Sequence, residues 1–194
     1  MIRDLMKRRR SVRKFKKDKF AIETLCSIVN AGLLAPSGAD QSPYTIIILD
    51  DESLKREIRK ESEAVDEDFH TDAPTWLKEW FAKKNITTEK AFLTDAPFLV
   101  VVAGNTHMPY WLESTWITIT YILLAAEEEG LGTLTYTPGR MDFLVPLLDL
   151  PKEYSPVVII PIGYPEEYPT KNETEKKNKI FFNKFGETHT NHLS

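Results

Sequence analysis

The sequence predicts an α+β domain in which helices surround a sheet of about four strands. Segments with the three–four apolar spacing of an amphipathic helix alternate with short β-branched runs that are typical of strands. The chain has 194 residues, a length at which one domain buries a core without disulfides or a structural metal. Hydrophobic residues make up 42% and charged residues 28%, an ordinary globular balance. We therefore expect residues 1–194 to form a single domain.

The first fifty residues predict two helices and a strand. Apolar side chains at helical spacing within the first ten residues indicate a short amphipathic helix before a basic run. Residues 22–34 carry one apolar helix face, which places Cys26 in the core, and Pro36 ends this helix. Residues 44–49 are a β-branched run, typical of a strand buried on both faces.

The next segment changes from a helix to a polar arm. Asp51 or Ser53 is placed to cap a helix that continues through Ile58. Residues 61–90 are acidic and interrupted by Pro74, yet they hold spaced aromatic side chains, so we expect a mobile lid rather than a linker. These aromatic residues are Phe69, Trp76, Trp80 and Phe81.

The second half of the chain alternates strands and helices. The longest predicted helix covers residues 110–129, and Gly130 follows it as a left-handed terminator. Residues 166–194 are charged and then aromatic, so we expect this tail to dock onto another surface, such as a second subunit. The other predicted elements are strands at 98–103, 132–136 and 157–162 and a helix at 141–148.

Composition narrows the class of protein and its location. Cys26 is the only cysteine, which excludes an intrachain disulfide and a zinc–cysteine cluster. The four histidines do not cluster, and we expect no metal site. The charged N-terminus does not resemble a signal peptide, and the longest stretch without charged side chains, 96–112, is too short to span a bilayer. We expect a cytoplasmic protein without a membrane partner.

A basic run is the first candidate binding motif. Nine Lys or Arg residues and one acid lie between Lys7 and Lys19, although the net charge of the chain is −4. Arginine presents paired donors that match phosphate oxygens, and a serine hydroxyl adds another donor. A solvated basic patch and a nucleic-acid contact are the alternatives. The residues that would bind a phosphate monoester are Arg9, Arg10, Ser11 and Arg13.

Two further motifs have the composition of ligand-binding loops. Small residues after the second helix let the backbone approach a flat ligand closely, although an ordinary helix–strand connection is the alternative. A Thr-Tyr-Thr-Pro turn places hydroxyls and backbone N–H groups at the carboxyl end of a strand, where α/β proteins bind ligands; an ordinary turn is the alternative. The two motifs comprise Pro36, Ser37 and Gly38, and Thr135, Tyr136 and Thr137.

Four short motifs in this order resemble the nitroreductase-type family of FMN-dependent oxidoreductases. They are Arg-Arg-Ser-x-Arg, Ala-Pro-Ser-Gly, Gly-Leu-Gly-Thr and Ile-Gly-Tyr-Pro, and they cover nearly the whole chain. The resemblance implies a central, mostly antiparallel sheet flanked by helices, with a lid at about 61–90. It also implies a homodimer in which each FMN contacts both subunits and a C-terminal arm, about 166–194, is exchanged between them.

The resemblance also implies a role for each motif. The arginine motif would hold the flavin phosphate, and the Pro-Ser-Gly motif of the other subunit would lie against the isoalloxazine ring. The Thr-Tyr-Thr turn would contact the cofactor, with Thr137 near the flavin N5 as the catalytic candidate. A basic residue of the tail would complete the phosphate site; Lys177 fits best by spacing, and Lys184 is the alternative.

Within that family, the sequence is most similar to the iodotyrosine deiodinase branch. The similarity lies in Ile-Arg-Lys at 58–60, Phe-Leu-Thr-Asp-Ala-Pro at 92–97 and the Thr-Tyr-Thr-Pro turn. In that branch, a Glu, a Tyr and a Lys of the lid bind the amino-acid part of a halotyrosine, and Lys90 matches the lysine. Alignment from the left places Asp66 and His70 at the other two positions, whereas alignment from the right places Val65 and Phe69 there.

The family resemblance implies an enzyme that reduces a small aromatic acceptor in a ping-pong cycle, with NAD(P)H as electron donor and FMN as carrier. Reductive dehalogenation of halotyrosine-like substrates is the alternative within the family. A non-catalytic flavin-binding or nucleic-acid-binding protein is the alternative from another class. The chain outside the basic run is acidic, and no set of aromatic residues for base stacking interleaves the basic run, so we expect no nucleic-acid partner.

Overall fold

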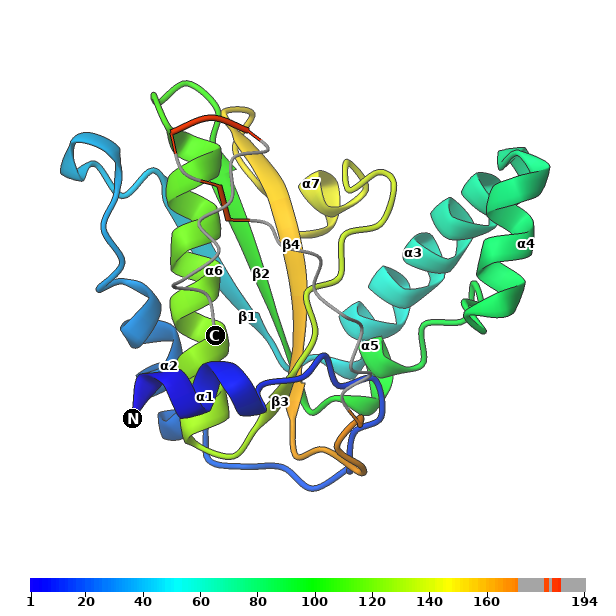
Figure 1. The fold of residues 1–194 in the computed structure, drawn as a ribbon, viewed down its shortest axis with the longest axis horizontal. Helices are drawn as coiled ribbons and strands as arrows, with labels where there is room; N and C mark the ends of the chain where they lie inside the picture. Colours follow the sequence, from blue (N-terminus) through cyan, green and yellow to red (C-terminus); the bar gives the residue numbers. More distant parts are fainter. Residues whose placement is uncertain (171–179, 182, 186–194) are drawn as a thin grey trace.

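The structure is a computed structural model that describes residues 1–170, 180–181 and 183–185. Its centre is a four-stranded sheet in the order β1-β2-β4-β3, and all three strand pairs are antiparallel. The α+β class and the antiparallel sheet are therefore confirmed (Figure 1). The strands are β1 (Tyr44–Leu49), β2 (Phe98–Asn105), β3 (Gly132–Thr133) and β4 (Tyr154–Gly163).

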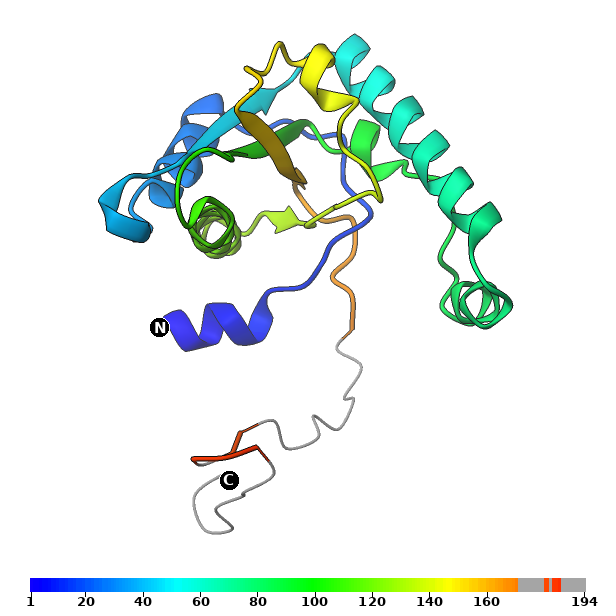
Figure 2. The same ribbon diagram turned by 90° about the horizontal axis from the view of Figure 1, so that it is seen from above.

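Helices cover both faces of the sheet (Figures 1 and 2). One face carries α2 and α6, and the other carries α3, α5 and α7. The helices are α1 (Ile2–Arg8), α2 (Ile22–Gly32), α3 (Glu52–Asp72), α4 (Thr75–Lys83), α5 (Phe92–Asp95), α6 (Trp111–Glu128) and α7 (Leu144–Leu147), with a short 3₁₀ turn at Gly38–Asp40.

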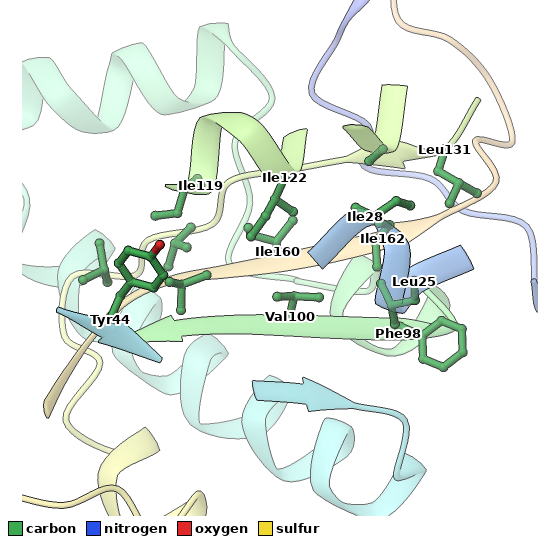
Figure 3. Packing of buried hydrophobic residues seen from close by; sticks show 14 of the residues in the cluster. Leu25, Ile28, Tyr44, Phe98, Val100, Ile119, Ile122, Leu131, Ile160 and Ile162 are labelled. Carbon is green, nitrogen blue, oxygen red and sulfur yellow. The ribbon is translucent and has the colours of Figure 1, made fainter. Parts of the chain in front are cut away.

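The core follows the two-residue period of the central strands. Val100 of β2 and Ile160 of β4 point toward α2 and α6, whereas their neighbours Val101 and Ile159 belong to the cluster under α3. Figure 3 shows the first cluster, in which Ile122 of α6 lies above the strands. Both central strands are thus buried on both faces, which explains their almost uninterrupted apolar sequence.

Several details differ from the sequence predictions because they depend on contacts between distant segments. β1 is an edge strand whose four inner residues are only half-buried, so the prediction of burial on both faces was wrong. Cys26 is exposed rather than buried, because α2 presents Leu25 and Ile28 to the sheet. Of the strand predicted at 132–136, only Gly132 and Thr133 form a ladder, and Thr133 and Tyr136 each form an isolated bridge. The helix predicted at 141–148 is a single turn.

The predicted lid is a pair of helices that extends from the domain (Figures 1 and 2). Its first helix, α3, is capped by Asp51, whose carboxylate accepts the Leu54 N–H at 2.6 Å. The helix continues to Asp72, well beyond the predicted end at Ile58. Pro74 precedes α4, which suits a residue that lacks an N–H to donate. Most of the tail predicted at 166–194 lies outside the described residues, and Lys177 is among the residues that are not described.

Candidate active site

The basic run lies beside β3 and the end of β4. Ser11 forms a parallel bridge with Thr133, and the Val12 N–H donates to the Thr133 carbonyl at 2.9 Å. Further along, the Lys16 N–H donates to Tyr164 at 2.9 Å. A Cβ on Gly132 would approach within 2.7 Å of Val12, so this close contact requires glycine. The arginine motif therefore lies beside β3, the strand that leads into the Thr-Tyr-Thr turn, although the two motifs are distant in sequence.

Arg9 is the residue of this motif that has buried donors without a partner among the described residues. Its side chain is half-buried, and its buried Nε and Nη2 atoms have no hydrogen-bond partner among the described residues. Burial lowers the pKa of Arg9, which the Glu127 charge partly opposes and the Arg13 charge reinforces. Native proteins rarely leave buried guanidinium donors unpaired, so this arrangement fits an anion.

The other members of the arginine motif have different surroundings. Arg10 Nη1 donates to the carbonyls of Lys7 at 2.6 Å, Arg8 at 2.9 Å and Arg9 at 2.7 Å, and so satisfies the end of α1. The Arg13 side chain is exposed and makes one long contact of 3.4 Å with the Ser11 carbonyl. Arg13 is thus available to a ligand, whereas one nitrogen of Arg10 is already engaged.

The Pro-Ser-Gly motif lies at the opposite end of α6. The Gly38 N–H donates to Ser114 Oγ at 3.0 Å near the start of that helix, whereas Arg8 meets Glu127 at 3.5 Å near its end. At 1.5 Å per residue, these two points are roughly 20 Å apart along the helix. The two motifs of one chain are therefore well separated.

The loop that follows this motif is tightly bent. Ala39, Asp40 and Ser42 all have positive φ, at 52°, 55° and 45°, a conformation that non-glycine residues adopt at some cost. Ser37 Oγ accepts the Ser42 N–H at 2.9 Å and closes the bend. A Cβ on Gly38 would come within 2.6 Å of the Tyr110 side chain, so only glycine allows this approach.

A charged pair lies at the base of the lid, where it joins the rest of the domain. Lys90 Nζ is 2.8 Å from Asp66 Oδ2, and only 8% and 14% of the two side chains are exposed. Lys90 Nζ also donates to the Thr87 carbonyl at 2.5 Å, and the Tyr136 hydroxyl donates to the same Asp66 oxygen at 3.2 Å. Three segments of the chain thus converge on one carboxylate.

The remaining residues of the two lid alignments lie elsewhere. Val65 is a buried core residue on the inner side of α3. The His70 ring stacks on Phe81 of α4, with ring centroids 4.2 Å apart. Phe69, also in the lid, is half-exposed. The structure therefore brings Asp66 to Lys90, and it places His70 in the contact between the two lid helices.

Glu63 supports Lys90 and was not anticipated from the sequence. Its Oε1 accepts the Lys90 backbone N–H at 2.7 Å and Arg59 Nε at 2.7 Å. Burial raises the pKa of Glu63, but these hydrogen bonds and the two cations outweigh it, so the net pKa is lowered. The i, i+4 spacing of Arg59 and Glu63 was visible in the sequence, whereas the link to Lys90 depends on how the lid folds back.

Within the described residues, no cluster of His, Cys, Asp and Glu is arranged to hold a metal ion. No helix there combines the length and the apolar composition that crossing a bilayer requires. In the Thr-Tyr-Thr turn, Thr135 is half-buried, Tyr136 is buried and Thr137 is exposed.

A family model described as "Nitroreductase family" matches residues 6–164, and the chain belongs to this family. An iodotyrosine deiodinase of Thermotoga neapolitana is 40% identical over 167 residues, which cover 86% of this chain and 90% of the relative.

Solved structures agree with this assignment. A crystal structure of oxidized iodotyrosine deiodinase bound to FMN and 3-iodo-L-tyrosine superposes with a TM-score of 0.82 at 38% identity, covering 93% of this chain and 100% of the other. An FMN-dependent nitroreductase from Clostridium difficile R20291 superposes with a TM-score of 0.70 at 27% identity, covering 93% and 98%.

Proposed function

We propose that this protein is an FMN-dependent enzyme that reductively dehalogenates a halotyrosine-like amino acid. The observation that carries this proposal is the buried Lys90–Asp66 pair beneath the lid. The similarity to iodotyrosine deiodinases supports it and favours dehalogenation over the reduction of nitroaromatic acceptors. In this proposal Lys90 binds the substrate carboxylate and Asp66 is the acid of the site.

The charged pair suits a zwitterion. A salt bridge that is neutral as a whole gains little from a ligand with net charge, because one buried charge would then stay uncompensated. An α-amino acid instead supplies an ammonium group for Asp66 and a carboxylate for Lys90, so each charge keeps a partner. The exposed aromatic side chains of the lid, Trp76 and Trp80, are available to exclude water when the lid lies over a substrate.

The chain offers a matching site for the cofactor. The unpaired donors of Arg9, together with Ser11 and the exposed Arg13, would hold the FMN phosphate, and Arg10 keeps donors beyond its helix cap. Thr135 and Thr137 would face the ring system. The bound flavin, once reduced by an external donor such as NAD(P)H, would supply the two electrons that, with one proton, replace the carbon–halogen bond by a carbon–hydrogen bond and release halide.

A second copy of the chain would complete the cofactor site. The Pro-Ser-Gly motif is separated from the arginine motif by the length of α6, so two copies place the two motifs on one flavin more readily than one copy does. Apolar side chains on the outer face of α6 support this arrangement: Trp116, Ile117 and Tyr121 are each about 40% exposed. We infer a homodimer that shares both sites.

The first test measures cofactor content and halide release. We expect the purified protein to bind FMN stoichiometrically and, with dithionite or NAD(P)H as reductant, to release iodide from 3-iodo-L-tyrosine. Lys90→Met should weaken binding of 3-iodo-L-tyrosine by on the order of tenfold or more, because its carboxylate loses a charged partner, and should leave nitrobenzene reduction unchanged.

Lys60→Met is the matched control, because Lys60 lies on the exposed side of α3 and its acidic partners in the described part of the chain are Glu57 and Glu61. A colourless protein that does not take up added FMN would refute the cofactor assignment. Equal losses for both substrates in Lys90→Met would refute the halotyrosine assignment.

Reduction of small aromatic acceptors by NAD(P)H is the second candidate. The family match and the similarity to an FMN-dependent nitroreductase favour it. Steady NAD(P)H consumption with nitrobenzene, at a rate far above that with 3-iodo-L-tyrosine, would select this activity instead.

A further inference from the structure

Tyr136 lies at the centre of the contact between the lid and the sheet. Its backbone N–H donates to the Ile159 carbonyl at 2.9 Å, and its own carbonyl accepts the Ile159 N–H at 2.9 Å. The ring packs edge-on against Phe92 of α5, with centroids 5.3 Å apart, and is only 8% exposed. The backbone and ring of Tyr136 are therefore fixed by β4 and α5, and the hydroxyl is its one polar group directed at the lid.

The Tyr136 hydroxyl acts as a hydrogen-bond donor. It donates to Asp66 Oδ2 at 3.2 Å, the oxygen that also meets Lys90 Nζ. Burial, and then the Asp66 charge, raise the pKa of the Tyr136 hydroxyl, so it stays protonated across the physiological range. Lys90 Nζ lies 6.0 Å from the Tyr136 ring centroid, so the same ring also borders the cation.

Asp66 needs such a partner because of its place on α3. The buried side chains that anchor this helix end at Val65. The far end of α3 and α4 extend away from the sheet (Figure 2), and we call residues 66–83 the arm. Beyond this point, the domain meets the arm at the Lys90–Asp66–Tyr136 contacts and at a long, exposed pair of Arg140 with Asp68 at 3.8 Å. A hydrogen bond from the rigid sheet layer therefore sets the orientation of the first carboxylate of the arm.

We propose that Tyr136 is a positioning residue of the substrate site, whose hydroxyl orients the Asp66 carboxylate to receive the ammonium group of an amino-acid substrate while Lys90 receives the carboxylate. This inference rests on the proposed function. It assigns the Tyr136 side chain to the substrate side of the turn rather than to the cofactor contacts that the sequence resemblance implies. Thr137, the residue expected near the flavin, follows Tyr136 directly in the chain. The same backbone segment would then contact the lid through Tyr136 and the cofactor through Thr137.

The test compares Tyr136→Phe with Tyr168→Phe. Tyr168 also donates a hydrogen bond of 3.2 Å, to the Gly130 carbonyl, but it lies away from the lid. Binding of 3-iodo-L-tyrosine and of 2-iodophenol, which lacks the amino-acid group, is measured on the FMN-loaded proteins. We expect Tyr136→Phe to weaken 3-iodo-L-tyrosine by roughly tenfold and 2-iodophenol by less than about twofold, with wild-type FMN content. Tyr168→Phe should change neither affinity.

A second measurement needs no substrate. Hydrogen exchange of residues 66–83 reports how firmly the domain holds the arm, and we expect it to be faster in Tyr136→Phe than in wild type. Equal weakening of both ligands, or unchanged affinities together with unchanged exchange, would overturn the proposal. If the wild type released no iodide and Tyr136→Phe still lost 3-iodo-L-tyrosine selectively, the proposed function would fail and the positioning role would stand.

If Tyr136→Phe does not fold, two variants of the acceptor test the same hydrogen bond. Asp66→Asn keeps an oxygen for the Tyr136 hydroxyl, whereas Asp66→Ala does not. Both variants lose the charge pairing with Lys90, so we expect arm exchange to be slower in Asp66→Asn than in Asp66→Ala by the contribution of the Tyr136 hydrogen bond. Equal exchange in these two variants would also overturn the proposal.

Discussion

Arg9 and Arg10 are neighbours in sequence, but their guanidinium groups have different tasks. Arg10 satisfies carbonyls at the end of α1, whereas two buried nitrogens of Arg9 have no partner among the described residues. A buried donor without a partner lowers the stability of the ligand-free protein. Such a donor is therefore typical of a residue that binds a ligand and not of one that stabilises the fold. Replacing Arg9 with an uncharged residue should therefore weaken cofactor binding without lowering the stability of the ligand-free protein.

Arg9→Met tests this difference. Methionine keeps the apolar stem but removes the unpaired charge, so we expect the FMN-free variant to be at least as stable to urea as FMN-free wild type. FMN affinity should fall by on the order of a hundredfold, because a charged hydrogen-bond partner of the phosphate is lost. Arg3→Met, at an exposed position on α1, the helix that precedes Arg9, should change neither property. Lower stability with unchanged FMN affinity would show that Arg9 is structural.

Single residues were predictable from the sequence where the signal was local. The position of Lys90 follows from its spacing to the Phe-Leu-Thr-Asp-Ala-Pro segment, and it does meet an acid of the lid. The choice between Asp66 and Val65 stayed open, because it depends on the lengths of α3, α4 and their connection. The direction of Tyr136 depends on its pairing with Ile159, a contact between distant segments that no local pattern reveals.

At the scale of elements, α3 serves both the core and the arm. Its first half is held by Lys55, a lysine whose side chain is only 1% exposed. Lys55 Nζ donates to the carbonyls of Ala96 at 2.9 Å and Pro97 at 3.3 Å and pairs with Glu52 at 2.8 Å. The ammonium group thus satisfies the backbone between α5 and β2 and fixes the angle at which α3 leaves the sheet.

Lys55→Met should therefore destabilise the whole domain. The substitution leaves two carbonyls and one carboxylate without their donor, which costs about 2–4 kcal/mol of unfolding free energy. For a chain of this size, that loss corresponds to a melting temperature lower by roughly 5–15 °C. Thermal unfolding followed by circular dichroism measures the shift. Lys60→Met is the exposed control, and a melting temperature equal to that of wild type in Lys55→Met would refute the anchoring role.

Elements were predictable to the extent that their burial is periodic. The strands at β2 and β4 and the helix α6 were placed within a few residues, and Gly130 does end α6 with a φ of 71°. The extension of α3 to Asp72 was not predicted, because its second half is polar on most sides and leaves no apolar stripe to follow. The half-burial of β1 follows from its place at the sheet edge, which is a property of the topology.

At the scale of the molecule, α6 separates the parts of the site and exposes an apolar face. Ile119 and Ile122 of this helix pack against the sheet, yet its outer side carries Trp116, Ile117 and Tyr121 where a monomer would carry polar residues. A second copy docked there would cover this face and bring the Pro-Ser-Gly loop of one chain toward the arginine motif of the other. Dimerisation and cofactor binding should therefore be coupled.

Trp116→Glu tests this coupling. A carboxylate in a buried interface loses its hydration without gaining a partner, so we expect the variant to sediment as a folded monomer where wild type is a dimer. The same variant should lose most of its FMN although every residue of the arginine motif is intact. Trp76→Glu, on the arm and 68% exposed, should remain a dimer with full FMN content. Sedimentation velocity and flavin absorbance on the same samples give both readouts, and a Trp116→Glu monomer that keeps stoichiometric FMN would mean that one chain completes the site alone.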